Sequence, residues 1–227
     1  AIAIALAMVI TGLLFTAALA FGMAHSNLKG RRFYTILCII PMYFGGGLIP
    51  YYFLIRALGL MNSFWVYIVP SLVGIWNMLL MRTYFLGIPI ALEESARIDG
   101  ANYFTVFFKI ILPVSVPILA TIALFIGVGQ WNSWFDAYIF ITDQSLKPIQ
   151  SVLLSIISEA QFAQRMAQAA SGQAGPIDAG RVGKGMTINV RSLTMATMMV
   201  TVLPIVMVYP FLQRYFIKGV MIGSLKG

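Results

Sequence analysis

The chain has 227 residues, of which 60% are hydrophobic and only 10% are charged. Soluble domains carry roughly 25% charged residues, so this composition excludes a water-soluble enzyme, a disordered protein and a nucleic-acid-binding domain. The net charge of +8 fits basic loops that face anionic lipid better than a nucleic-acid surface. We therefore expect an integral membrane protein that contacts lipid.

Five apolar segments are each long enough to cross a bilayer as a helix, which needs about 20 residues. They cover residues 1–24, 33–55, about 64–81, about 110–130 and about 193–212. None carries a charge in its interior, and none alternates with the two-residue period of a strand. The predicted fold class is therefore all-α, a polytopic bundle of transmembrane helices that forms one domain over residues 1–227.

Basic residues predict the orientation of these spans. Lys29, Arg31 and Arg32 lie in the first connection, Arg82, Arg97 and Lys109 in the third, and Arg214, Lys218 and Lys226 in the tail, whereas the second connection holds Arg56 alone. The positive-inside rule then places the first loop, the third loop (87–109) and the tail in the cytoplasm, and the loop 131–192 outside. The start of the chain would face outward, so we expect that a first span is missing and that the full protein has six.

The sequence offers no site for catalysis. Cys38 is the only cysteine and His25 the only histidine, so neither a disulfide within the chain nor a Cys/His metal cluster is expected. The run Gly183-Lys184-Gly185 lacks the serine or threonine of a phosphate-binding loop. The apolar segments also lack the charged groups that ion-coupled carriers need. We expect no catalytic residue, metal or cofactor in this chain, and an energy source in another protein.

Glycines and aromatic residues mark candidates for a translocation path. Gly45, Gly46 and Gly47 interrupt the second apolar segment between two prolines. Irregular backbone at membrane depth is tolerated beside a water-filled cavity, whereas glycine also permits close helix packing, and the sequence leaves both interpretations open. Further candidates, which equally suit an interfacial aromatic belt or the helix core, are Tyr51, Asn77, Trp131 and Asn132.

The loop 87–109 predicts two short helices joined by a sharp bend. Pro89 suits the start of the first helix, and Gly100 suits its end because glycine adopts the left-handed conformation. Asn102 suits the N-cap of the second helix. A surface helix with acidic and apolar side chains is a natural contact for a partner protein, although it could also lie on lipid.

These residues carry a resemblance to a known family. Glu94-Ser95-Ala96, then Gly100, then Ile110-x-Leu112-Pro113 resembles the EAA motif of ABC importer permeases, with Ser95 in place of the usual alanine. The stretches 92–101 and 213–219 resemble the carbohydrate (maltose-type) branch of type I importers. The run 41–50 is similar to permeases for acidic xylan or pectin oligosaccharides, including aldouronate.

The resemblance implies an assembly in the bacterial inner membrane. A second homologous permease subunit would complete the path, two cytoplasmic ATPase subunits would bind ATP and Mg, and an extracytoplasmic solute-binding protein would deliver an oligosaccharide, uronate-containing ones included. The chain itself would not be an enzyme. Residues 170–185 would reach toward the binding protein. By the same resemblance, the ATPase would couple to Glu93, Glu94, Ser95, Ala96, Arg97, Asp99, Gly100 and Ala101, and to the tail Gly223, Ser224, Leu225, Lys226 and Gly227.

Two other functions stay open at this point. A permease of the same superfamily for another solute, such as an amino acid or phosphate, would carry the same EAA-like motif. A self-sufficient channel or secondary carrier belongs to a different class, and the missing charges in the spans count against it.

Overall fold

The computed structural model describes residues 1–24, 28–173 and 190–224, and every regular element in these ranges is helical. In chain order the elements are α1 (Ile2–Ala24), α2 (Arg31–Tyr43), α3 (Leu48–Ala57), the 3-10 helix η1 (Phe64–Tyr67), α4 (Ile75–Leu86), α5 (Ile90–Ile98), α6 (Tyr103–Val106), the π-helix η2 (Phe107–Ile111), α7 (Leu112–Val114), α8 (Val116–Trp131), α9 (Phe135–Phe140), the 3-10 helix η3 (Gln144–Leu146), α10 (Ile149–Gln173) and α11 (Val190–Ser224). The predicted all-α class is confirmed.

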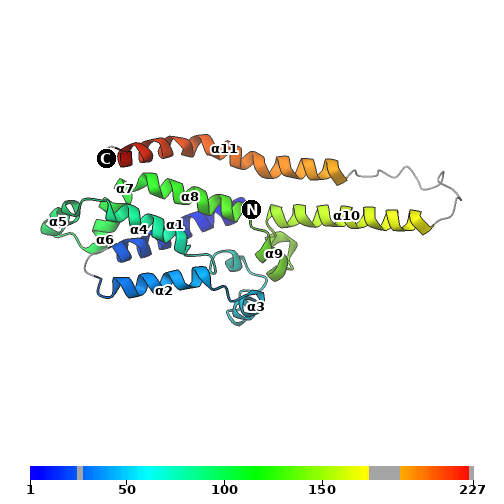
Figure 1. Ribbon diagram of the computed structural model, residues 1–227, viewed down its shortest axis with the longest axis horizontal. Helices are drawn as coiled ribbons and strands as arrows, with labels where there is room; N and C mark the ends of the chain where they lie inside the picture. Colours follow the sequence, from blue (N-terminus) through cyan, green and yellow to red (C-terminus); the bar gives the residue numbers. More distant parts are fainter. Residues whose placement is uncertain (25–27, 174–189, 225–227) are drawn as a thin grey trace.

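The long helices form an elongated bundle with two distinct ends. Helix α1 packs against α4 and α8, and α11 lies along α8 (Figure 1). In Figure 1 the C-terminal part of α11 lies at the same end of the bundle as α5, α6 and α7, whereas the start of α1 lies at the end that holds α9. We call these the α5 end and the α9 end. Helix α10 and the first part of α11 extend beyond the bundle at the α9 end (Figure 1).

Among the described residues, two helices are long and apolar enough to cross a membrane without a break: α1 and the stretch 192–210 of α11. Three more crossings are possible if each bent pair of helices forms one span: α2 with α3, α4 with α5, and the segment 103–114 with α8. The break between α2 and α3 falls at 44–47, at the glycine run, and the two helices differ in direction by 116°. The predicted spans 1–24 and 193–212 both coincide with helices.

The bounds of two predicted spans are wrong. Residues 64–81 do not form one helix: η1 covers four residues, an irregular stretch follows, and α4 begins only at Ile75. Pro70 and Gly74 lie in that stretch, and both disfavour a continuous helix although the hydropathy there is high. The predicted span 110–130 begins too early, because the chain turns by 84° between the segment 103–114 and α8.

Two apolar clusters hold the two ends of the bundle. At the α5 end, α1, α4, η2 and α8 bury a cluster that includes Ala20, Met81, Phe107 and Ile122. At the α9 end, the start of α1, α3, η1 and α9 bury a second cluster around Tyr67 and Phe140. The molecule therefore has a separate packed core at each end, and a segment of α1 contributes to both.

Candidate functional site

Helix α5 is a short surface helix that ends in a well-defined turn. Pro89 precedes its first residue, and none of its residues is buried. At its end Gly100 adopts a φ of 83°, and its N–H donates to the carbonyl of Arg97 at 3.0 Å. The N–H of Ala101 donates to the carbonyl of Ala96 at 2.9 Å. This pair of bonds is a Schellman motif, and the predicted left-handed role of Gly100 is confirmed.

The helix that follows anchors α5 to the bundle. Asn102 caps α6, since its Oδ1 accepts from the N–H of Thr105 at 2.8 Å, as the sequence predicts. Phe107 and Ile111 of η2 are buried in the cluster at the α5 end. The Phe107 ring lies 5.3 Å from that of Phe21 in α1. A displacement of α5 would therefore reach α1 through side chains that are buried against it.

The outer face of α5 exposes apolar and charged groups together. Ile98 is 86% exposed and Phe104, just beyond the turn, is 75% exposed. The guanidinium of Arg97 lies over the ring of Tyr103 at 4.9 Å from its centroid, which supports the turn. Glu94 and Asp99 are exposed. Exposed large apolar side chains beside charges are typical of a surface that a partner covers.

The other predicted coupling residues occupy two different environments. Ala96 and Ala101 face inward and pack against the apolar cluster. Ser95 is exposed and donates from Oγ to the carbonyl of Leu92 at 3.2 Å. Glu93 is half-buried, on the side of α5 that faces the bundle. The structure thus gives Glu93 and Glu94, neighbours in sequence, different surroundings.

Parts of the predicted tail and loop lie outside the described residues. Gly223 and Ser224 belong to the end of α11, whereas Leu225, Lys226 and Gly227 are beyond the described part of the chain. The stretch 174–185, most of the segment predicted to reach the binding protein, is also outside it. Both assignments stay predictions.

The three glycines of the interrupted span do not serve close packing within the described chain. A Cβ atom added at Gly45 or Gly47 would meet no described heavy atom within 4 Å, and one added at Gly46 would meet only the Cβ of Pro50, at 3.9 Å. Gly47 has a φ of 80°, so glycine is needed there for the backbone turn between α2 and α3. The interpretation as an irregular break is therefore the one that the geometry favours.

Tyr51, four residues after this turn, belongs to a polar cluster at the α9 end. Its hydroxyl donates to Oδ1 of Asp136 at 3.1 Å, and its ring lies 5.4 Å from that of Phe140. Burial raises the pKa of Asp136, and the bond from Tyr51 opposes that rise. Asp136 belongs to α9, which is none of the candidate spans. Sequence reasoning missed Asp136, because its partner is 85 residues away.

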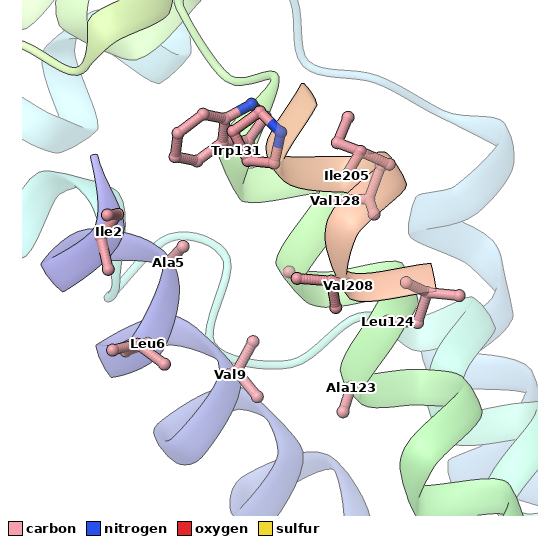
Figure 2. A pocket seen from close by; sticks show the side chains of 12 residues that line it. Ile2, Ala5, Leu6, Val9, Ala123, Leu124, Val128, Trp131, Ile205 and Val208 are labelled. Carbon is pink, nitrogen blue, oxygen red and sulfur yellow. The ribbon is translucent and has the colours of Figure 1, made fainter. Parts of the chain in front are cut away.

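Trp131 lies beside an apolar cavity rather than beside the other candidates. The cavity has a volume of about 430 Å³ and lies between α1, α8 and α11 (Figure 2). The N–H of the Trp131 ring donates to the carbonyl of Thr201 at 3.0 Å, so it is already used within the fold. Asn132 donates to the carbonyl of Val128 at 3.0 Å, and Asn77 in α4 does not line this cavity. These side chains do not converge on one polar site.

The raised pKa of Asp136 predicts how the stability of the protein depends on pH. Because folding raises this pKa, the contribution of Asp136 to stability is fully present below its ordinary pKa and is lost as the pH rises through the folded value. We expect Asp136→Asn, which still accepts from Tyr51, to raise the melting temperature at pH 7 and to have less effect near pH 4. Tyr51→Phe should lower stability by about 1.5–3 kcal/mol, the range for a bond to a charged group.

Thermal unfolding of the purified protein between pH 4 and 8 checks both variants. A lower melting temperature for Asp136→Asn at pH 7 would contradict the conclusion that partial burial raises the pKa of Asp136.

Two arginines at the α5 end are functional candidates that sequence reasoning counted only as loop charges. The guanidinium of Arg31 donates to the carbonyl of Ala24 at 3.4 Å, and Nε of Arg82 donates to that of Met23 at 3.2 Å. Both therefore cap the last carbonyls of α1. Arg31 is the first residue of α2, where a cation opposes the helix dipole, so its position is explained by α1 rather than by its own helix. The one sequence feature that points to this role is the position of Arg31 seven residues after Ala24, just beyond the end of the first apolar segment.

These features define a polytopic helical membrane protein with an exposed, rigidly anchored surface helix at one end. No family model matches the chain. It is 37% identical over 209 residues to the polygalacturonan/rhamnogalacturonan transport system permease protein YtcP of Bacillus subtilis, covering 92% of this chain and 69% of that protein. It is 28% identical over 226 residues to the arabinooligosaccharides transport system permease protein AraQ of Halalkalibacterium halodurans, covering 99% and 71%.

A solved structure agrees with these relatives. The chain matches, with a TM-score of 0.76 and 26% identity, a chain of a bacterial ABC transporter involved in the import of the acidic polysaccharide alginate, over 94% of this chain and 73% of that one. The chain belongs to the family of sugar ABC importer permeases. Such a subunit is a transport component and not itself an enzyme.

Proposed function

We propose that this permease forms half of a path for acidic oligosaccharides through the bacterial inner membrane. Its relatives support the substrate class, because one is named for polygalacturonan and rhamnogalacturonan and the structural match imports alginate. All three of these polysaccharides contain uronate residues. A second homologous permease would supply the other half of the path, and a solute-binding protein outside would deliver the sugar.

The observation that carries the coupling role is the geometry of α5. An exposed helix that ends in a Schellman turn at Gly100 is followed by a segment buried in the bundle core. A partner that binds α5 would thus transmit its movement to the bundle without first deforming a flexible loop. We place the α5 end in the cytoplasm, on the positive-inside pattern of the basic loops. Two ATPases, which would bind ATP and Mg, would dock there against Glu94, Arg97 and Ile98.

The physical role of ATP follows from this arrangement. A ligand shifts a two-state equilibrium only by its differential affinity for the two states. Nucleotide would shift the equilibrium by binding at the ATPases, and the loaded binding protein would shift it by binding at the α9 end. The tail, Gly223 to Gly227, would add a second contact with the ATPases.

Co-purification tests the proposal. We would isolate the complex gently from its native membrane, reconstitute it in vesicles and measure ATP turnover with binding proteins loaded with oligogalacturonate or with a neutral arabino-oligosaccharide. The expected result is a second permease and an ATPase in the complex, with turnover raised by the acidic sugar. A response to the neutral sugar alone would overturn the substrate class. A chain that purifies alone and transports without ATP would overturn the coupling role.

A further inference from the structure

A small cavity lies where α5 meets the end of α1 and the start of α2. Its volume is about 170 Å³, and its walls include Phe21, Phe85 and Ile111. Two charged residues of opposite sign also line it, Arg31 from α2 and Glu93 from α5. Both are half-buried. Charges that share a cavity with apolar walls interact more strongly than they would in water, because the surroundings screen them less.

The arginine side of this cavity is tied to α1. Arg31 donates to the carbonyl of Ala24, the last residue of that helix. Arg82 donates to the carbonyl of Met23 beside it. Because the C-terminal end of a helix carries partial negative charge, the two guanidinium groups hold it electrostatically as well as by hydrogen bonds. A displacement of Arg31 would therefore displace the end of α1 through this hydrogen bond.

We propose that Glu93, Arg31 and Arg82 are positioning residues that link α5 to α1, so that Glu93 acts on the bundle while Glu94 meets the ATPase. When α5 moves, the carboxylate of Glu93 attracts the guanidinium of Arg31. Arg31 then moves the end of α1 through its hydrogen bond to Ala24. Since α1 packs against both α4 and α8, this movement reaches the spans directly. The link adds a polar route to the apolar one through Phe107. It rests on the coupling role proposed above.

The experiment uses the complete importer in vesicles, with its ATPases, partner permease and loaded binding protein. The variants are Glu93→Gln and Arg31→Gln, singly and together, and the readout is sugar taken up per ATP hydrolysed. Arg32→Gln is the matched control, because Arg32 is the neighbouring residue but is exposed. Arg31→Lys keeps a positive charge at this position of the cavity wall. Retention of the ATPases in each purified variant is measured in parallel.

We expect each single variant to lower uptake per ATP by about fivefold, a typical size for coupling between sites. The double variant should be no worse than either single one, because the two residues form one link. Arg31→Lys and Arg32→Gln should keep uptake per ATP near the parent value, and all variants should retain their ATPases.

Three results would overturn the link. The first is unchanged uptake per ATP in either single variant. The second is a double variant whose defect is the product of the two single defects, which would make the residues independent. The third is loss of the ATPases from Glu93→Gln, which would place Glu93 in the docking surface. A parent complex without ATPases would instead refute the proposed function and is seen before any variant is compared.

Discussion

Replacing Gly100 with proline is expected to lower sugar uptake by roughly tenfold or more while ATP hydrolysis continues, a typical size for the loss of coupling between two sites. Gly100 has a φ of 83°, whereas proline fixes φ near −65°. Proline also removes the N–H that donates to the carbonyl of Arg97 at 3.0 Å. The combined loss is roughly 2 kcal/mol or more at the turn that sets the direction of α5. Uptake and ATP turnover of the reconstituted importer, at equal amounts of complex, measure the effect.

The chain contains a matched control for this substitution. Gly59, at the end of α3, has a φ of 68°, and its N–H donates to the carbonyl of Arg56 at 3.1 Å. The N–H of Leu60 donates to the carbonyl of Ile55 at 3.1 Å, which completes the same motif. Gly59→Pro therefore introduces the same incompatible φ and removes the equivalent N–H donor, but at the α9 end. Its uptake per ATP should stay near the parent value, even if less complex is obtained.

A milder substitution separates backbone strain from the loss of a contact. Asparagine tolerates the left-handed conformation better than other non-glycine residues, so Gly100→Asn should keep a substantial part of the uptake. Normal uptake in Gly100→Pro, at a normal amount in the membrane, would refute the role of α5 in coupling. Equal losses of uptake per ATP in the Gly59 and Gly100 variants would point to general damage to the fold.

Features that depend on neighbouring residues could be predicted from the sequence. The left-handed end of α5 at Gly100 and the cap of α6 at Asn102 were both expected, and both are present. Each needs only a few residues and one or two hydrogen bonds within a turn. A break at the glycine run was one of two interpretations that the sequence left open, and the positive φ of Gly47 supports it because glycine adopts that conformation at no steric cost.

Features that depend on distant residues could not be predicted. High hydropathy at 64–81 gave no indication that α4 begins only at Ile75, since an apolar run marks burial in lipid or protein and not the start of a helix. Arg31 and Arg82 looked like loop charges, because the carbonyls that they cap belong to α1. Asp136 accepts a hydrogen bond from Tyr51, and these residues of α9 and α3 come together only in the folded chain.

Replacing Ile98 with aspartate is the second substitution with a large expected effect. Ile98 is 86% exposed at the end of α5, and burial of such a side chain contributes about 1.5–3 kcal/mol to an interface. Aspartate forfeits this contribution and brings a charge that must lose its water. We expect the ATPases to bind roughly 30-fold more weakly or worse. The amount of ATPase retained by the purified permease pair measures this directly.

Two control variants identify the cause of such a loss. Leu28→Asp makes the same kind of change at another exposed residue of the α5 end, outside α5, and should retain the ATPases. Aspartate near the end of a helix also opposes the helix dipole, whereas lysine there favours it. Ile98→Lys therefore removes the apolar contact without weakening α5. If α5 docks into the ATPase, both Ile98 variants lose the ATPase.

The same pair of variants distinguishes docking from attachment to lipid. A surface helix that lies on an anionic membrane is strengthened by an added lysine and weakened by an added aspartate. Full retention of the ATPase by Ile98→Lys, together with a defect in Ile98→Asp, would therefore place the exposed face of α5 on lipid. Loss in both variants would place it against protein. The sign of the lysine result decides between the two because the variants share the loss of the isoleucine and differ only in charge.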